Sequence, residues 1–320
     1  MGTKALQQDP RQENAPLLAC VMIACAIIFG CSNGAFAKDG DNNGDDDNSG
    51  AKSNSPWPTT YLDMRTSFAT VPAGSLPIGF GSTSLFSAFE ALALSNGSGV
   101  PAIPTSLPLA SRQGVAIDLP LTVDVTDHVS LYAGVSGTAA NTSGQGWSSF
   151  DLTSWNVGLQ ADLYQQNGGK IPTVTWQSTY TQSIPNNTLA TTTFTNILEF
   201  DYALDKDETR GLLAGVQDTR VEIGTALARI HPADIFYLGG YYQWPSNWKF
   251  TGRLGVQHFG GAELLSFTPI QSFTQPVLRL DLDRMDDNDN RLFGVTAEIM
   301  WLPKPAYMLT LRTPVYMVRN

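Results

Sequence analysis

Apolar and polar residues alternate strictly along most of the chain from residue 114 onward. In 115–126, and again in 129–136 after a turn at Asp127-His128, apolar residues occupy every second position, and Asp, Thr, Ser, Tyr and Gly fill many of the positions between them. A period of two places the two sets on opposite faces of a β-strand. The pattern predicts eleven strands, and a weaker one lies near Tyr61. Their ranges are 61–71, 114–126, 129–136, 155–163, 171–183, 191–204, 210–223, 233–244, 248–258, 276–285, 292–302 and 307–318.

The connections between these predicted strands alternate in length. Short turns fall at every second junction, and the junctions between them are mostly longer, with 303–305 as a short exception. This alternation is typical of bacterial outer-membrane barrels, which have short periplasmic turns and longer external loops. A soluble sandwich does not impose it. The short turns lie at 126–128, 166–169, 205–208, 245–247 and 286–290, and the longer connections before 114 and at 139–149, 184–190, 224–232 and 259–275.

A sheet in hydrocarbon must pair every backbone amide within the protein, so it must close on itself. We therefore predict an all-β fold, a closed antiparallel transmembrane β-barrel of about twelve strands over 59–320. Aromatic residues near the strand ends fit interfacial girdles, and the competing interpretation is that they form an ordinary sandwich core. These aromatic residues are Trp155, Trp176, Tyr242, Trp244, Trp248, Trp301 and Tyr307.

For the first 58 residues, the sequence predicts a signal peptide followed by a disordered linker. An uncharged apolar stretch, 15–31, holds all three cysteines and is followed by Ala35-Phe36-Ala37, which predicts a secretory signal peptide over 1–37. An uncleaved anchor and a lipoprotein signal with an acylated Cys31 are the alternatives. Residues 38–58 predict a disordered acidic linker. Asp39-x-Asp41-x-Asn43-Gly44 matches half of a calcium loop, but Gly50 replaces the required Glu, so we expect no metal site.

Several segments resemble known outer-membrane barrels. The run GVAIDLPLTVDVTDHVSLYAGVSG, residues 114–137, is similar to the early hairpin of barrels from Gram-negative proteobacteria. The stretches 208–216, 231–232 and 238–242 are similar to barrels associated with the meta-pathway of phenol degradation. The resemblance implies a channel or transporter for small, often aromatic, molecules. The chain departs from many such barrels because it ends in Val318-Arg319-Asn320 instead of an aromatic residue, although Tyr316 can substitute.

Charge narrows the possible functions. The chain has 29 acidic and 19 basic side chains and a net charge of −10, which argues against a nucleic-acid partner. Charged residues at alternate strand positions are expected to line the lumen, acidic ones in the N-terminal half and basic ones in the C-terminal half. They predict either a constriction that orients polar or weakly acidic solutes, or a salt-bridged filling that conducts little. These residues are Asp118, Asp124, Asp162, Glu199, Asp201, Lys249, Arg253, Arg279, Asp281, Asp283, Glu298 and Arg312.

The predicted loop 259–275 carries apolar residues, among them Phe267 and Phe273. We interpret this loop either as a mouth that folds inward and binds an aromatic solute, or as packing on the rim of the barrel.

Catalysis is the less favoured hypothesis. His128 and Ser130 share one strand face, as in barrel-wall lipid hydrolases or deacylases, but the histidine falls in a predicted turn. The sequence contains no common nucleophile, zinc or phosphate-binding motif, so we expect neither an enzyme nor a cofactor. We predict a bacterial outer-membrane channel for passive passage of small solutes, aromatic ones included, whose partners are outer-membrane lipid and the solute. The alternative is a non-conducting structural or partner-binding barrel.

Overall fold

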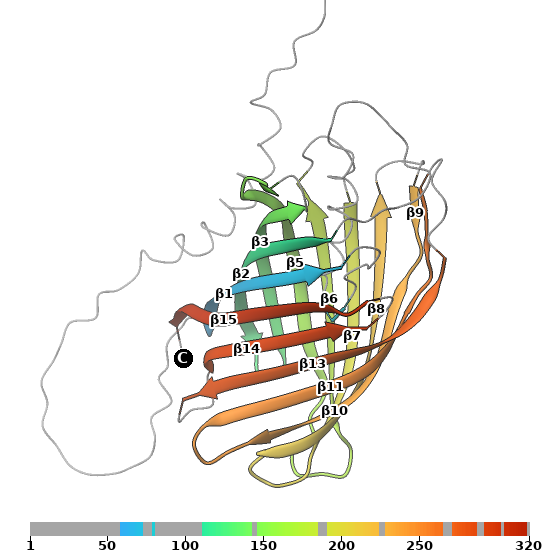
Figure 1. Cartoon of the computed structure of the whole chain (residues 1–320). Coiled ribbons are helices and arrows are strands. Elements are labelled where there is room, and N and C mark those ends of the chain that lie inside the picture. The colour runs from blue at the N-terminus through green and yellow to red at the C-terminus, as the bar shows by residue number, and fades with distance from the viewer. Residues whose placement is uncertain are drawn as a thin grey trace, which may run out of the picture. The chain divides into compact units, whose positions relative to one another are not determined.

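The computed structural model describes residues 58–72, 79–80, 111–142, 146–184, 191–223, 228–264, 271–286, 291–301 and 304–318. These residues form twelve long strands and three short ones (Figure 1). The long strands are β1 (Thr60–Val71), β2 (Arg112–Thr126), β3 (Val129–Thr142), β5 (Asp151–Tyr164), β6 (Thr173–Ser183), β7 (Thr191–Ala203), β8 (Arg210–Ile223), β10 (Ala233–Gln243), β11 (Trp248–Phe259), β13 (Phe273–Met285), β14 (Arg291–Met300) and β15 (Ala306–Val318).

The sheet closes into a barrel because its first and last strands pair. β1 is antiparallel to β15, from Thr60 opposite Val318 to Thr70 opposite Tyr307, and its other edge pairs with β2. Every other long strand pairs with its neighbours in chain order. The prediction of a closed antiparallel barrel of about twelve strands is confirmed. Among the described residues, no helix is long and apolar enough to cross a membrane.

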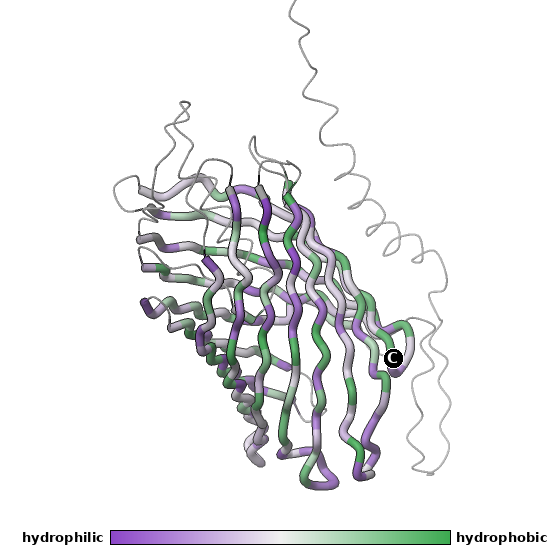
Figure 2. Tube along the Cα trace, turned by 90° about the vertical axis from the view of Figure 1, so that its right-hand side faces the viewer, coloured by the Kyte–Doolittle hydropathy of each residue, from purple (hydrophilic) through white to green (hydrophobic). Residues whose placement is uncertain are grey.

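The alternation in the sequence places apolar side chains on the outside of the barrel. In β10, Phe236 and Leu238 point outward and are 61% and 70% exposed. Ile235 and Tyr237, which alternate with them, face the lumen and are buried. Figure 2 shows the same alternation of hydrophobic and hydrophilic residues along many strands. A face this apolar is stable only against lipid, whereas the inner face can be polar.

The aromatic side chains at the strand ends stack on one another. Tyr242 contacts Trp244, and Trp248 contacts Phe293, in edge-to-face pairs with ring centroids 5.3 and 5.5 Å apart. Both pairs lie beside short turns. Aromatic rings at such positions suit the boundary between lipid tails and water.

The short turns are built by local polar contacts. In the turn between β7 and β8, the Asp205 carboxylate accepts hydrogen bonds from the Thr209 hydroxyl and backbone N–H, at 2.6 and 2.8 Å. The hydroxyl contact is the main reason that the pKa of Asp205 is lowered. In the turn between β5 and β6, Asn167 and Gly168 take positive φ values of 44° and 73°, which Asn and Gly tolerate best.

Three tyrosines lie across glycines of the neighbouring strand. Tyr237 covers Gly215, Tyr241 covers Gly211, and Tyr132 covers Gly158. A glycine has no side chain, so each ring can lie flat against the backbone of the neighbouring strand. Its hydroxyl then reaches the strand beyond that neighbour. The Tyr237 hydroxyl, for example, donates to Glu199 of β7 at 2.7 Å. These pairs fix neighbouring strands in register.

The short strands were absent from the sequence-based prediction. β4 (Gly146–Trp147) extends the connection after β3, while β9 (Ala228–Ile230) and β12 (Ala262–Leu264) pair with each other between two longer connections. The expected signal peptide, almost all of the expected acidic linker with its partial calcium loop, and Phe267 lie outside the described residues.

Candidate functional site: a polar cavity in the lumen

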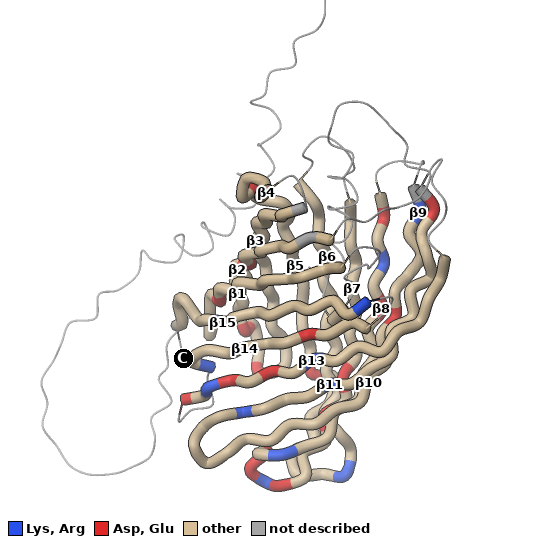
Figure 3. Tube along the Cα trace, in the orientation of Figure 1, with Lys and Arg blue, Asp and Glu red and all other residues tan. Residues whose placement is uncertain are grey.

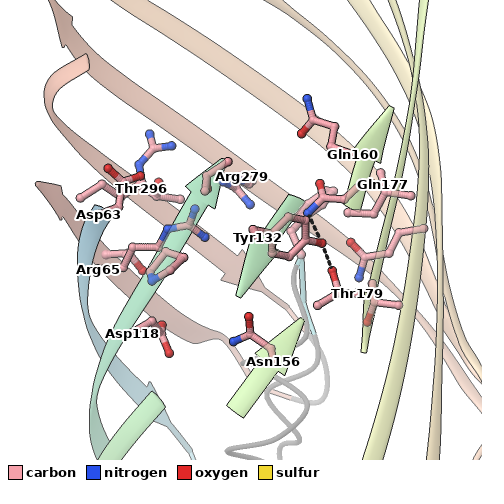
Figure 4. Close-up of a pocket in the computed structure, with 18 of the residues that line it drawn as sticks. Asp63, Arg65, Asp118, Tyr132, Asn156, Gln160, Gln177, Thr179, Arg279 and Thr296 are labelled. Atoms are coloured by element: carbon pink, nitrogen blue, oxygen red, sulfur yellow. Dashed lines mark hydrogen bonds between the residues drawn. The ribbon is translucent and has the colours of Figure 1, made fainter. Parts of the chain in front are cut away.

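The lumen holds a cavity of about 530 Å³. Its lining is formed mainly by polar side chains from the inner faces of many strands, and Figure 4 shows how these side chains project toward one another. A volume of this size is within the usual range for small-molecule sites.

Strand register arranges the lining of the C-terminal wall in rows. One row is apolar: Tyr237, Gly255, Val277, Met300 and Ala306 lie opposite one another in turn on β10, β11, β13, β14 and β15. The next row toward the turns of β10–β11 and β13–β14 is charged, with Arg253, Arg279 and Glu298 on adjacent strands. The sequence thus builds an apolar layer next to a charged layer.

The charged row is part of a larger ion-pair network that also includes residues of neighbouring rows. The network consists of Asp63, Glu199, Arg253, Arg279, Asp281, Asp283, Arg291, Glu298 and Arg312. Asp281 is its centre: its side chain is 4% exposed, and Arg253, Arg279 and Arg312 each lie 3.0 to 3.2 Å from one of its oxygens. The Thr296 hydroxyl donates to the same carboxylate at 2.6 Å. Buried charges are tolerated when they are paired in this way.

Each arginine of this network contacts two carboxylates. Arg253 crosses the wall to Glu199 at 3.0 Å, while Arg279 also reaches Glu298 at 3.6 Å. Arg312 also lies 2.8 Å from Asp283. Arg291 joins Asp283 at 3.2 Å to Asp63 of the first strand at 3.6 Å, so the network spans the seam where the barrel closes.

The wall formed by β3, β5 and β6 is polar but nearly uncharged. β3 and β6 contain no charged residue, whereas charges follow the strands of the opposite wall (Figure 3). The neutral wall presents hydroxyls and amides to the cavity, including those of Tyr132, Asn156, Gln160 and Gln177. A charged wall therefore faces a wall of neutral hydrogen-bonding groups.

Phe80 limits the cavity on the side of the apolar row. It belongs to the long connection between β1 and β2, and its ring is buried edge-to-face against Tyr237, with centroids 5.4 Å apart. The carbonyl of the preceding Gly79 accepts a hydrogen bond from Gln217 at 3.5 Å. A methyl group at Gly79 would lie 2.9 Å from a Glu298 oxygen, so this carboxylate would have to shift to admit a larger residue. Phe80 forms one buried cluster with Ile235, Tyr237, Val277, Met300 and Ala306.

The structure brings several of the predicted lumen residues together and separates others. Asp281 and Asp283 lie in the ion-pair network. Near the turns, Asp124 accepts from Ser130 at 2.6 Å, and Asp162 accepts from Thr175 at 2.9 Å. Asp201 hydrogen bonds to Tyr241, and Lys249 lies over the ring of the same tyrosine, 4.6 Å from its centroid. The cavity itself is lined by Asp118, Glu199, Arg253, Arg279, Glu298 and Arg312.

Of the two phenylalanines of the predicted mouth loop, only Phe273 is described. It begins β13 and stacks on the fully buried Phe259, with ring centroids 5.4 Å apart.

Sequence reasoning missed part of the lining. Asp63 and Arg65 occupy alternate positions of the first strand, and applying the alternation there would have placed both in the lumen. Tyr132 and the neutral amides carry no charge and gave no signal. Phe80 lies in a stretch without periodicity, so no pattern predicted that it enters the barrel.

The residues considered for catalysis are not arranged as a hydrolytic site. His128 is exposed in the turn between β2 and β3, and the Ser130 hydroxyl donates to Asp124 instead. A nucleophile needs a base within hydrogen-bond reach. Within the described ranges, no group of three or more His, Cys, Asp or Glu side chains could hold a metal ion.

Comparison with known proteins identifies the architecture. No family model matches the chain, and no curated protein does. An outer membrane channel from Pseudomonas putida F1 is similar in structure, with a TM-score of 0.51 and 11% identity over 84% of this chain and 100% of that one. The translocator domain of the autotransporter NalP from Neisseria meningitidis gives a TM-score of 0.44 and 9% identity over 94% and 95% of the two chains. With its lipid-compatible outer face, the chain has the fold of a bacterial outer-membrane β-barrel.

Proposed function

We propose that this barrel is a channel for the passive passage of small polar or weakly acidic solutes across the outer membrane. The observation that carries the proposal is the polar cavity inside the lumen, which a merely structural barrel does not need. The charged wall and the neutral wall create a transverse field that orients a polar solute. The channel from Pseudomonas putida has the same architecture, which is consistent with this proposal.

Phe80 lines the cavity and also belongs to the buried apolar cluster, and we propose that its ring restricts the path. Replacing Phe80 by Ala removes this ring from the cavity lining, so we expect single-channel conductance in planar bilayers to rise about twofold or more. Phe236→Ala on the lipid-facing side of β10 is the matched control and should leave conductance unchanged. If neither the native barrel nor Phe80→Ala produces current steps, the passage proposal is wrong.

A non-conducting barrel is the second candidate, and two observations favour it. The ion-pair network ties β7, β11, β13, β14, β15 and β1 together across the lumen, and Phe80 closes the apolar side of the cavity. In this case the buried charges hold the barrel round instead of guiding solutes. Complete absence of current from folded protein supports this candidate.

Ion preference tests whether the network faces the conduction path. Arg279→Gln removes one lumen cation and leaves Glu298 with less compensation. We expect the ratio of cation to anion permeability, taken from reversal potentials in a salt gradient, to rise by about twofold. Arg220→Gln, which removes an arginine 67% exposed outside the network, should not change this ratio. Equal ratios for both variants would remove Arg279 from the path.

A further inference from the structure

Arg65 differs from the other arginines that line the cavity. Arg253, Arg279, Arg291 and Arg312 each contact two carboxylates, whereas within the described part of the chain Arg65 has no carboxylate within 4.0 Å. It is nevertheless fixed in place, because β1 sets it directly between Arg312 of β15 and Asp118 of β2. Its side chain is exposed to the cavity (Figure 4).

Neither of the two carboxylates beside Arg65 forms an ion pair with it. Asp63 lies 3.6 Å from Arg291, and Asp118, which is 9% exposed, lies opposite Arg65 on β2 without an ion pair to it. The Arg65 guanidinium therefore keeps its planar set of donors available, and such a fork matches a carboxylate. Because Asp63 and Asp118 remain close by, they disfavour a ligand with more than one negative charge.

The opposite wall offers hydrogen bonds without charge. The side-chain amides of Asn156 and Gln160 have no hydrogen-bond partner among the described residues, and both line the cavity. Gln177 donates to the Tyr132 hydroxyl at 3.0 Å, and its amide oxygen remains an acceptor. Figure 4 shows these groups across the open space from Arg65. Amides donate and accept, as hydroxyl groups of a ligand do.

We propose that Arg65 and this neutral wall form a binding site for a small hydroxylated organic monocarboxylate, of the size and type of a sugar acid. The carboxylate binds the Arg65 guanidinium, and the hydroxyls of the ligand bind Asn156, Gln160 and Gln177. The inference names the solute class of the proposed channel and rests on that function. Its test measures binding alone, so a barrel that binds the ligand but passes no current would overturn the channel and leave this site standing.

The experiment is titration calorimetry of the folded full-length barrel in detergent with three sugars of similar size. Glucuronate carries a negative charge, glucose carries none, and glucosamine is positive. We expect glucuronate to bind at least about tenfold more tightly than glucose, and glucosamine to bind no better than glucose, because a charge-assisted hydrogen bond is stronger than a neutral one. Equal binding of glucuronate and glucose overturns the proposal, as does tighter binding of glucosamine.

Variants of Arg65 locate the site. Arg65→Gln should weaken glucuronate binding about tenfold or more and leave glucose binding unchanged, while Arg65→Lys keeps the charge and should retain most of the affinity. Arg220→Gln on the outer face should bind as the native protein does. Undiminished binding by Arg65→Gln, with the barrel folded by circular dichroism, places the anion elsewhere and overturns the assignment.

Discussion

Replacing Asp281 by Asn is expected to lower the free energy of unfolding by about 3 to 5 kcal/mol. The substitution keeps the shape of the side chain and a partner for Thr296, but it removes the charge that Arg253, Arg279 and Arg312 share. Each arginine keeps one other carboxylate, so the barrel should still fold. Urea unfolding in lipid vesicles, followed by tryptophan fluorescence, measures the loss.

The control for Asp281 is Asp218→Asn. Asp218 lies on the outer face and pairs at 3.0 Å with Arg220, whose side chain is 67% exposed. Pairs with exposed partners contribute less than about 1 kcal/mol. If the two variants lose equal stability, the lumen network does not hold the barrel together, and its charges serve passage alone.

Gly215→Ala should lower the free energy of unfolding by about 1 to 3 kcal/mol, although Ala usually favours a strand more than Gly does. The added methyl group would overlap the Tyr237 ring. The ring cannot move away cheaply, because it is buried against Phe80 and its hydroxyl is bound to Glu199. The same unfolding assay measures this effect.

Gly252→Ala is the matched control for Gly215→Ala. Its methyl group would have its nearest contact at 3.6 Å, which is ordinary packing distance, so stability should stay equal or rise. A double variant that also carries Tyr237→Ala tests the cause. If Gly215→Ala remains as costly without the tyrosine ring, the ring is not the obstacle.

The strands were predictable because one face of each strand contacts lipid and the other face contacts the polar lumen. In β13, Leu278, Leu280 and Leu282 contact lipid, whereas Arg279 and Asp281 face the lumen. The two environments therefore produce an alternation of apolar and charged residues that is visible in the sequence. Register was not predictable in the same way. Tyr237 covers Gly215 only because β10 and β8 align as they do, and neither residue indicates its partner from the sequence.

The candidate site was partly predictable for a similar reason. Alternation identified Glu199 and Arg253 as lumen candidates, but the two lie 54 positions apart and their contact depends on Tyr237 and Gly215 between them. The position of Phe80 could not be predicted, because apolar and polar residues do not alternate regularly in its segment. Its position depends on contacts with residues that are distant in the sequence, such as Tyr237. Arg65 was overlooked because its strand was the weakest of the twelve.

The seam between β1 and β15 has a consequence for how the molecule is made. Its partners, such as Thr60 and Val318, stand at opposite ends of the barrel sequence, so this ladder depends on the most distant residues. Contacts of such long range form slowly. Until the final strand arrives, β1 presents an unpaired edge that can recruit other chains. The closure of this seam is therefore the step of assembly at which the risk of aggregation is greatest. A chaperone that covers the unpaired edge of β1 would act at this step.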